Sequence, residues 1–324
     1  MSKWLTIQTV EMMERRVVNQ LRSKNIDSGL YALGGEVLAN AWKTLAESNL
    51  PRTWDITSGP IRDNYRDERC VVDFGPGSGT PCRSAIQALL DQNKIQDIVL
   101  VDVAPAMLAM AEDYLHRNTQ ATITSITADF MQDTHALNEV LKGFSTPKLF
   151  LCLGGTVGQF NQAQVLWALR AVLSRKDRLL LGLNFYPLEH SERFLRELAD
   201  AYSLETEYFG LQFLAACGIE PNYRCVLASF GGDVEDPTVQ VIRVFYRFPS
   251  ETVLILGREQ VIFGEGECLQ FIESRRFLAS EIERHLRQHG LRVIASEYSP
   301  YSSGEHGLFL CRKAESSTSA LCAR

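Results

Sequence analysis

The stretch that decides the fold is Val71-Val72-Asp73-Phe74-Gly75-Pro76-Gly77-Ser78-Gly79-Thr80. An apolar run leads directly into a Gly-x-Gly-x-Gly turn, and an amphipathic segment, 81–93, follows the turn at once. Glycines at this spacing let the chain turn tightly and let a ligand approach the backbone. The stretch therefore predicts a strand, a ligand-binding turn and a helix in immediate succession.

The residues around this loop alternate between short apolar runs and amphipathic segments. The apolar runs are 70–74, 98–103, 121–128, 149–153 and 178–183, with amphipathic segments between them at 81–93, 105–117, 136–141 and 162–174. Apolar strands that alternate with helices are typical of a parallel sheet covered on both faces. We therefore predict an α/β fold with a Rossmann-like sheet, whose ligands bind at the carboxyl ends of the strands.

Changes in this pattern divide the chain into segments. Residues 1–60 are predicted to be mostly helical, since apolar residues such as Val10, Met13 and Val17 recur at helical spacing. A long helical segment and antiparallel strands interrupt the alternation from 186 to 277, after which it resumes. We predict a Rossmann-like domain formed by 69–185 and 278–313, and an inserted α+β substrate domain at 186–277. The N-terminal helical segment, 1–68, is expected to contribute to the substrate domain, and the tail, 314–324, to be disordered.

Composition limits the classes of function. The net charge is −6 and no block of Lys and Arg occurs, so we expect no nucleic-acid partner. The longest apolar runs, such as 149–153, are far too short to span a bilayer, and the N-terminus lacks the apolar core of a secretory signal. The 8 Cys are scattered without a Cys-x-x-Cys pair, which favours reduced thiols in a cytoplasmic protein without a metal site.

An acidic residue follows the glycine loop at the distance that nucleotide-binding folds use. Asp102 ends the next apolar run, where its carboxylate can accept hydrogen bonds from the two ribose hydroxyls of an adenosine cofactor. Dinucleotide-binding loops usually have the longer spacing Gly-x-Gly-x-x-Gly, in which the pyrophosphate meets the helix N-terminus. The shorter spacing here favours another adenosine cofactor over a dinucleotide.

The acidic start and the short spacing of the loop resemble motif I of the class I S-adenosylmethionine-dependent methyltransferases. The resemblance implies S-adenosylmethionine as cofactor and a sheet of seven strands, the last of which, 307–312, is antiparallel and inserted beside the sixth. It also implies that Asp102 binds the ribose and that Asp129 and Phe130 hydrogen-bond and cover the adenine. The cofactor-binding residues expected from it are Asp73, Gly75, Gly77, Gly79, Asp102, Asp129, Phe130 and Gly154.

A second loop resembles one particular family within this class of methyltransferases. Residues 153–160, Leu-Gly-Gly-Thr-Val-Gly-Gln-Phe, resemble the Gly-Ser-Thr-Ile-Gly-Asn-Phe signature of the histidine-specific methyltransferase family. That family includes the histidine N-α-methyltransferases of the ergothioneine pathway and the dimethylallyltryptophan N-methyltransferases. Three further stretches, 181–184, 201–222 and 266–277, resemble other motifs of the family. The resemblance implies N-methylation of a small amino acid or of a metabolite derived from one.

The departures from the family pattern concern the substrate. Gln159 stands where the family has an asparagine that holds the substrate amino acid, and Asn184 stands where it has an aspartate. Ile272 stands where the histidine enzymes have a glutamate that helps to recognise the imidazole, two residues before Ser274. Because an isoleucine cannot accept an N–H hydrogen bond, we predict a substrate other than histidine. Gln212 replaces one of the family's helix asparagines.

These positions supply the candidate catalytic and substrate-binding residues. An N-methylating site needs acceptors near the amine and aromatic faces for the cationic product, whereas O- or C-methylation needs a general base. His306 is a candidate base, although an ordinary surface histidine is the alternative, and Glu267 has the alternative of a solvated turn. The catalytic candidates are Gln159, Asn184, Tyr186, Glu267 and His306, and the substrate-binding candidates are Tyr31, Tyr208, Gln212, Ile272 and Ser274. O- or C-methylation of a small metabolite, or a non-catalytic cofactor-binding module, are the alternative functions.

Overall fold

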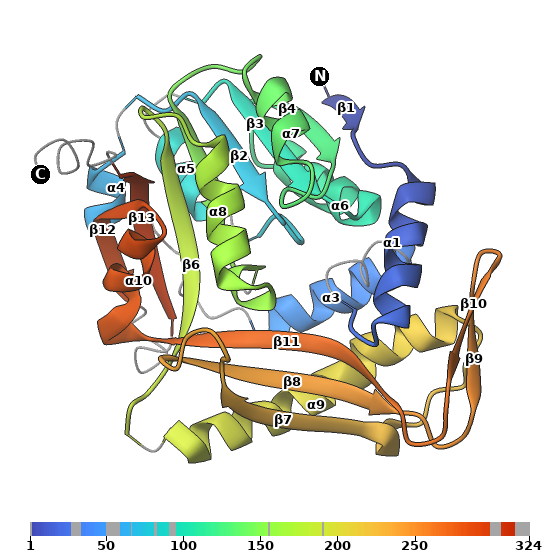
Figure 1. Ribbon diagram of the computed structural model, residues 1–324. Helices are drawn as coiled ribbons and strands as arrows, with labels where there is room; N and C mark the ends of the chain where they lie inside the picture. Colours follow the sequence, from blue (N-terminus) through green and yellow to red (C-terminus); the bar gives the residue numbers. More distant parts are fainter. Residues whose placement is uncertain are drawn as a thin grey trace, which may run out of the picture.

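The computed structural model describes residues 2–26, 34–49, 59–65, 67–80, 83–90, 95–154, 156–189, 191–298 and 306–314 (Figure 1). Tyr31, a substrate-binding candidate, lies outside these residues, and so does the side chain of Tyr208.

The centre of the molecule is a mostly parallel sheet. Its strands are, in spatial order, β1 (Ser2–Thr6), β4 (Thr122–Thr127), β3 (Asp97–Asp102), β2 (Cys70–Phe74), β5 (Lys148–Cys152), β6 (Arg178–Tyr186), β13 (His306–Lys313) and β12 (Leu291–Tyr298). The last strand, β13, pairs antiparallel with both β6 and β12. The predicted fold class is therefore confirmed, including the antiparallel last strand beside the sixth.

The strand β1 is an element of the N-terminal segment that the helical pattern did not predict. Residues 2–6 pair in parallel with residues 123–127 of β4 and extend the edge of the sheet. Leu5 and Ile7, two residues apart, pack against the core, as expected of a strand with one covered face. The helical pattern begins only at α1 (Val10–Arg22), where the side chain of Thr9 accepts a hydrogen bond from the amide of Met12 at 3.3 Å.

Helices cover both faces of the main sheet. The core on one face includes apolar residues of α7 (Thr134–Leu141), α8 (Gln162–Val172) and α10 (Ile282–Gln288). The core on the other face includes residues of α4 (Pro60–Asp63), α5 (Arg83–Leu90) and α6 (Pro105–His116). All residues of β2 are buried, which explains why the central strands are continuous apolar runs.

A second set of strands lies across the carboxyl ends of the main-sheet strands (Figure 1). It consists of β7 (Val226–Gly232), β8 (Val239–Arg247) and β11 (Cys268–Leu278), which pair antiparallel. The end of β11 pairs in parallel with the end of β6, so that Phe277 lies opposite Phe185. The hairpin of β9 (Thr252–Leu256) and β10 (Glu259–Phe263) connects β8 to β11. The sequence pattern did not predict β11, because a bulge between Gln270 and Ile272 interrupts its alternation.

Three helices complete the enclosure of this edge. The long α9 (Ser191–Ala216) packs against β7, β8 and the end of β6, where Tyr186, Leu195 and Ile242 form a buried cluster. The helix α3 (Gly35–Asn49) contacts both α9 and α6, and α1 lies beside them at the same side of the molecule (Figure 1).

Short 3-10 turns occur at η2 (Thr156–Gln159), η3 (Tyr223–Cys225) and η4 (Ala279–Glu281).

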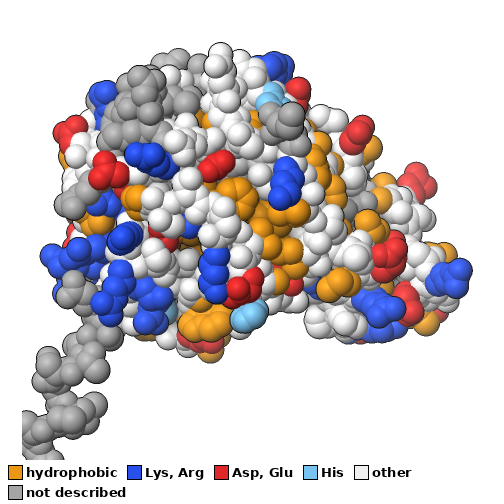
Figure 2. Space-filling model, turned by 90° about the horizontal axis from the view of Figure 1, so that it is seen from above, with side chains coloured by type: hydrophobic (Ala, Val, Ile, Leu, Met, Phe, Trp, Pro, Cys, Tyr) orange, Lys and Arg blue, Asp and Glu red, His pale blue; other side chains and the backbone are white. Residues whose placement is uncertain are grey.

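Figure 2 shows the face of the molecule that lies opposite β7, β8 and β11. It is viewed from above the amino ends of the main-sheet strands. Lys and Arg side chains gather on one side of this face, and apolar side chains form a band in its middle. The carboxyl ends of the strands, which carry the predicted site residues, lie at the other side, next to β11 (Figure 1).

Candidate functional site

The glycine loop that follows β2 has a conformation that requires glycine. Gly75, Gly77 and Gly79 have φ angles of 67°, 56° and 79°, in the left-handed region that other residues rarely adopt. The amide of Gly75 donates to the carbonyl of Val101 at 2.9 Å, which ties the loop to β3. A Cβ atom on Gly79 would lie 3.2 Å from the backbone of Ala111, so the loop also packs closely on α6.

Two carboxylates lie at the ends of the strands beside this loop. Asp73 is buried near the end of β2, and Asp102 is the last residue of β3, where its Oδ1 accepts a hydrogen bond from the amide of Ala104 at 2.9 Å. Burial raises the pKa of the Asp102 carboxyl to about 6, against the opposing effect of backbone hydrogen bonds from Ala104 and Val103. The carboxyl is therefore mostly ionised at pH 7 and can accept hydrogen bonds from hydroxyl groups.

The next strand end carries Asp129 and Phe130, and the structure gives them different surroundings. Asp129 accepts a hydrogen bond from the amide of Met131 at 2.9 Å through Oδ1, and its Oδ2 forms an ion pair with Arg16 of α1. The ring of Phe130 packs between Phe74 and Phe160, with centroid distances of 5.1 and 6.2 Å. Asp129 therefore ties the N-terminal helix to this edge of the sheet, while Phe130 belongs to the core beneath it.

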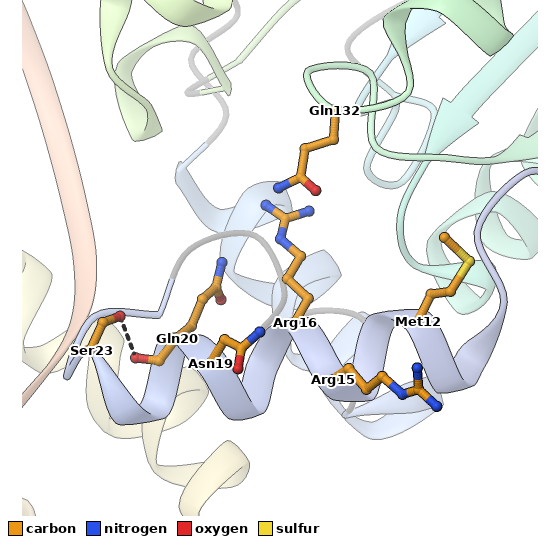
Figure 3. A pocket seen from close by; sticks show the side chains of 7 residues that line it. All are labelled: Met12, Arg15, Arg16, Asn19, Gln20, Ser23 and Gln132. Carbon is orange, nitrogen blue, oxygen red and sulfur yellow. Dashed lines mark hydrogen bonds between the residues drawn. The ribbon is translucent and has the colours of Figure 1, made fainter.

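A surface cleft of about 510 Å³ lies beside the ion pair of Arg16 and Asp129. It runs between α1 and the connection from β4 to α7, and Arg16 and Gln132 point toward each other across it (Figure 3). The remaining lining residues, all from α1 and the residue after it, are Met12, Arg15, Asn19, Gln20 and Ser23.

The glycine loop is covered on one side and open on another. A Cβ atom on Gly77 would lie 3.2 Å from Nε1 of Trp42, so α3 reaches the loop through this side chain. Gly154 follows β5 with a φ of 70°, and apart from its chain neighbours no heavy atom of the described residues lies within 4 Å of the position that a Cβ would take. Space is therefore present next to the loop, at the end of the neighbouring strand.

A second group of polar side chains lies at the ends of β6 and β13. Asn184 and His306 are opposite each other in the antiparallel pair, and Nδ1 of His306 hydrogen-bonds to Oδ1 of Asn184. Because the amide oxygen is an acceptor, Nδ1 carries the proton and Nε2 is left as an acceptor. Burial first, and then the positive charge of Arg276, lower the pKa of His306 to about 4, so its imidazole is neutral at pH 7.

One face of β11 continues this group. Ser274 and Arg276 are both buried and are two residues apart, so they lie on the same face of the strand. Nη2 of Arg276 donates to the hydroxyl of Tyr202 on α9 at 2.9 Å, and that hydroxyl lies 3.1 Å from Oγ of Ser274. The structure thus brings together three predicted residues, Asn184, Ser274 and His306, through Arg276.

Arg276 and Tyr202 were not predicted as site residues. Both stand in stretches that resemble the family motifs, at 266–277 and 201–222, but nothing in the sequence shows that the two stretches meet. A signal was present in the spacing, since Ile272, Ser274 and Arg276 share one face once 268–278 is known to be a strand.

Three other predicted residues, Tyr186, Gln159 and Gln212, have different surroundings. The hydroxyl of Tyr186 donates to the carbonyl of Thr238 at 3.2 Å, within the cluster between α9 and β8. Gln159 ends η2, which packs on β11 so closely that a Cβ on Gly158 would lie 2.9 Å from the carbonyl oxygen of Arg275. Gln212 is exposed on α9.

Glu267 and Arg276 lie near opposite ends of β11. Glu267 precedes the first residue of the strand, forms an ion pair with Lys24 and accepts a hydrogen bond from the amide of Gly264 at 3.0 Å. With about 3.3 Å per residue, the length of β11 separates it from Arg276 by tens of ångströms. The structure does not bring Glu267 to the group around His306.

The sequence matches a known protein family. A family model described as a histidine-specific, S-adenosylmethionine-dependent methyltransferase matches residues 55–303, which is more than half of the chain. The protein belongs to this methyltransferase family. A comparison with curated proteins finds none that matches the chain. S-Adenosylmethionine is therefore the methyl donor of this enzyme, and histidine is the substrate that the family description names.

Solved structures with a similar fold include other methyltransferases of small molecules. One is the S-adenosylmethionine-bound amino pentose methyltransferase of calicheamicin biosynthesis from Micromonospora echinaspora, with 16% identity, a TM-score of 0.40, and coverage of 84% of this chain and 96% of that one. Another is the 1,6-didemethyltoxoflavin N1-methyltransferase from Burkholderia thailandensis, with 10% identity, a TM-score of 0.44, and coverage of 93% and 91%. These similarities concern the fold alone.

The glycine loop of the methyltransferase fits S-adenosylmethionine. The loop glycines would hold the backbone in the conformation that a closely approaching ligand needs, the carboxylate of Asp102 is available for the ribose hydroxyls, and open space adjoins Gly154. In the described part of the chain, no three His, Cys, Asp or Glu side chains come together to hold a metal ion. Among the same residues, no helix combines the length and apolar content needed to cross a membrane.

Proposed function

We propose that the enzyme transfers a methyl group to the amino group of a small amino acid, or of a metabolite derived from one, other than histidine. The observation that supports this substrate class most directly is Ile272. Its side chain is half-buried on β11 and packs against the apolar cluster that includes Leu211 and Phe213 of α9. An imidazole N–H placed against this side chain would lose its hydrogen bonds to water and gain none, which disfavours histidine.

The cofactor-binding residues proposed for this reaction are those of the glycine loop and the three strand ends. Asp102 would accept the ribose hydroxyls, and the backbone around Gly75, Gly77 and Gly154 would hold the cofactor above the ends of β2 and β5. Asp129 would meet the adenine amine while Arg16 holds its other oxygen. S-Adenosylmethionine supplies an electrophilic methyl group to a nucleophile aligned with it.

The nucleophile must be a neutral amine, because an ammonium group has no lone pair to attack the methyl carbon. With a pKa of about 4, His306 is too weak a base to hold the proton of an ammonium group. The amine would therefore bind in its neutral form and donate a hydrogen bond to Nε2 of His306, which Asn184 leaves free to accept by fixing the tautomer. The methyl transfer then depends on the alignment of the amine with the methyl carbon, which the protein supplies by holding both partners.

A neutral histidine at the carboxyl edge also suits a second candidate function, O-methylation or C-methylation of a small metabolite on the same fold. A hydroxyl or carbon acid needs a general base within hydrogen-bond reach, and His306 is the only histidine that the described structure places at this edge of the sheet. The two functions differ in the atom that carries the new methyl group.

The test is a methyl-transfer assay with purified protein, S-adenosylmethionine and a panel of amino acids, biogenic amines and phenols. Formation of S-adenosylhomocysteine identifies the substrates, and fragmentation of the product by mass spectrometry locates the methyl group. We expect an N-methylated product from an amino acid or amine other than histidine. If histidine is the best substrate, or if the methyl group is on oxygen or carbon, the proposal is wrong.

A further inference from the structure

Among the described residues, Arg276 is a buried cation without an anionic partner. Only 5% of the residue is exposed, and its one hydrogen bond in the described structure goes from Nη2 to the hydroxyl of Tyr202, at 2.9 Å. The guanidinium carbon lies 5.9 Å from the centre of the same ring, and Nε is buried with no hydrogen-bond partner. No carboxylate of the described chain forms an ion pair with Arg276.

The neighbouring buried arginine, Arg275, does have anionic partners. Arg275 is buried to the same degree, but it projects from the other face of β11 and meets two carboxylates, Asp233 at 3.0 Å and Glu273 at 3.1 Å. Withdrawing a guanidinium from water is costly unless an anion compensates it. The contrast between the two residues leaves the guanidinium of Arg276 without a compensating anion among the described residues, and so available to an anionic ligand.

The groups around Arg276 are neutral and arranged to hold an oxygen-bearing anion. The hydroxyl of Tyr202 accepts from Arg276 and lies 3.1 Å from Oγ of Ser274, where either hydroxyl can be the donor. When Tyr202 donates, the hydroxyl proton of Ser274 can be donated to a ligand. The guanidinium of Arg276 and the hydroxyl of Ser274 thus lie on one face of β11, and a carboxylate is the small anion with two oxygens that matches such a pair of groups.

The location of Arg276 favours the substrate over the cofactor as the source of that anion. Arg276 precedes the residues of β11 that pair with the end of β6, and its charge acts on His306, the proposed hydrogen-bond acceptor for the amine. The glycine loop follows β2, which is separated from β6 by β5. A group held at Arg276 therefore lies on the substrate side of the carboxyl edge.

We propose that Arg276, together with the hydroxyl of Ser274, binds the carboxylate of the substrate, so that the enzyme methylates an amino acid and discriminates against the corresponding decarboxylated amine. This inference rests on the proposed function, since it assumes that the group beside His306 is the amine to be methylated. The carboxylate of the cofactor's methionine part has the same chemistry, and the experiment separates the two sources.

The experiment compares the full-length enzyme with Arg276→Met and Arg276→Lys. For each, kcat and KM are measured with the best amino acid of the panel, its decarboxylated amine and its methyl ester. We expect the wild type to prefer the amino acid in kcat/KM by about 10- to 100-fold, the size of an effect expected for charge-assisted hydrogen bonds. Arg276→Met should abolish the preference by raising KM for the amino acid, while Arg276→Lys should retain part of it.

Thermal unfolding distinguishes a binding role from a structural one. Because Arg276→Met replaces an uncompensated buried cation with an apolar side chain, its Tm should equal or exceed that of the wild type. The matched control is Arg275→Met on the same strand, which leaves Asp233 and Glu273 without their cation and should lower the Tm. A lower Tm for Arg276→Met, with an unchanged preference for the amino acid, would show a structural role and overturn the proposal.

Calorimetry with S-adenosylhomocysteine completes the test. If Arg276→Met weakens this binding and leaves the preference between amino acid and amine unchanged, the cofactor carboxylate occupies the site and the proposal is overturned. If no amine is methylated, but amino acids raise the Tm of the S-adenosylhomocysteine-loaded wild type and not that of Arg276→Met, the carboxylate site stands and the proposed function fails. If neither methylation nor stabilisation occurs with any amino acid, the carboxylate site is wrong.

Discussion

The two ends of the carboxyl edge are built by different means. At the end formed by β2 and β3, the backbone itself makes the site, through three glycines in left-handed conformations and one carboxylate at a strand end. At the end formed by β6, β13 and β11, side chains make it, and they come from positions as far apart as 184 and 306. The first end is formed by a few residues that are close together in sequence. The second end forms only after the strands have paired. We therefore expect changes at the first end to act on the cofactor and changes at the second to act on the substrate.

The largest effect is expected for Asp102→Ala. The loss of two hydrogen bonds from ribose hydroxyls to an ionised carboxylate should weaken the binding of S-adenosylhomocysteine about 100-fold, as measured by calorimetry. The control is Asp113→Ala on α6, whose exposed carboxylate pairs only with Arg117 one turn away. Equal affinities of Asp102→Ala and the wild type would contradict the role of Asp102 in cofactor binding.

The second effect concerns the backbone of the glycine loop. Gly79→Ala forces a residue with a Cβ into a φ of 79° and places that Cβ 3.2 Å from the backbone of Ala111. We expect about tenfold weaker cofactor binding and a Tm lower by a few degrees, since such strain costs about 1–3 kcal/mol. Gly231→Ala in β7 is the control, because a Cβ there meets no atom within 4 Å. If both variants behave alike, the loop conformation does not matter for binding.

The third prediction concerns the substrate end. Ile272→Glu places a carboxylate on the face of β11 that carries Ser274 and Arg276, and the half-buried position leaves the new side chain partly hydrated. We expect kcat/KM for histidine to rise about tenfold, the effect of one hydrogen bond to a charged group, and cofactor affinity to stay unchanged. Ile272→Leu is the size-matched control. A loss of cofactor affinity in Ile272→Glu would show that the two ends are not separable.

The smallest effect is a dependence of stability on pH. His306 has a pKa of about 4 in the folded protein, below its ordinary value, so between about 6.5 and 4 the unfolded chain binds the additional proton. The stability that the neutral histidine contributes is therefore complete above pH 6.5 and is lost as the pH falls toward 4. The decrease in Tm from pH 7 to pH 5 should be smaller in His306→Gln than in the wild type.

Asp102 has the opposite effect on how stability depends on pH, so it is left unchanged in every variant that is compared. Its pKa of about 6 lies above the ordinary value, so the folded state binds the additional proton and gains stability as the pH falls through that window. The control is His135→Gln, because His135 is exposed on α7. An equal decrease in Tm for His306→Gln and His135→Gln would show that burial of His306 has no measurable effect on stability.

The sequence predicted the parts of the fold that depend on local pattern. The apolar runs of the central strands and the glycine loop identified the sheet, because a strand buried on both faces must be apolar throughout. The position of the last strand came from the resemblance to the methyltransferases. The sequence pattern failed at β1, a five-residue edge strand without such a run, and at β11, where the bulge near Gln270 hides the alternation. These failures are local, since both strands have weak patterns of their own.

What the sequence by itself determined is the local structure of the proposed cofactor end of this methyltransferase. The glycines of the loop and the aspartate that ends the next strand can be identified from their spacing, because positive φ angles and strand ends are properties of adjacent residues. Only the tertiary structure decided the substrate end. The pairing of Asn184 with His306 and of Arg276 with Tyr202 depends on strand register and helix packing, as does the absence of a carboxylate partner for Arg276 among the described residues. Whether a buried charge is compensated is a property of all its neighbours in space, and the order of the residues does not show it.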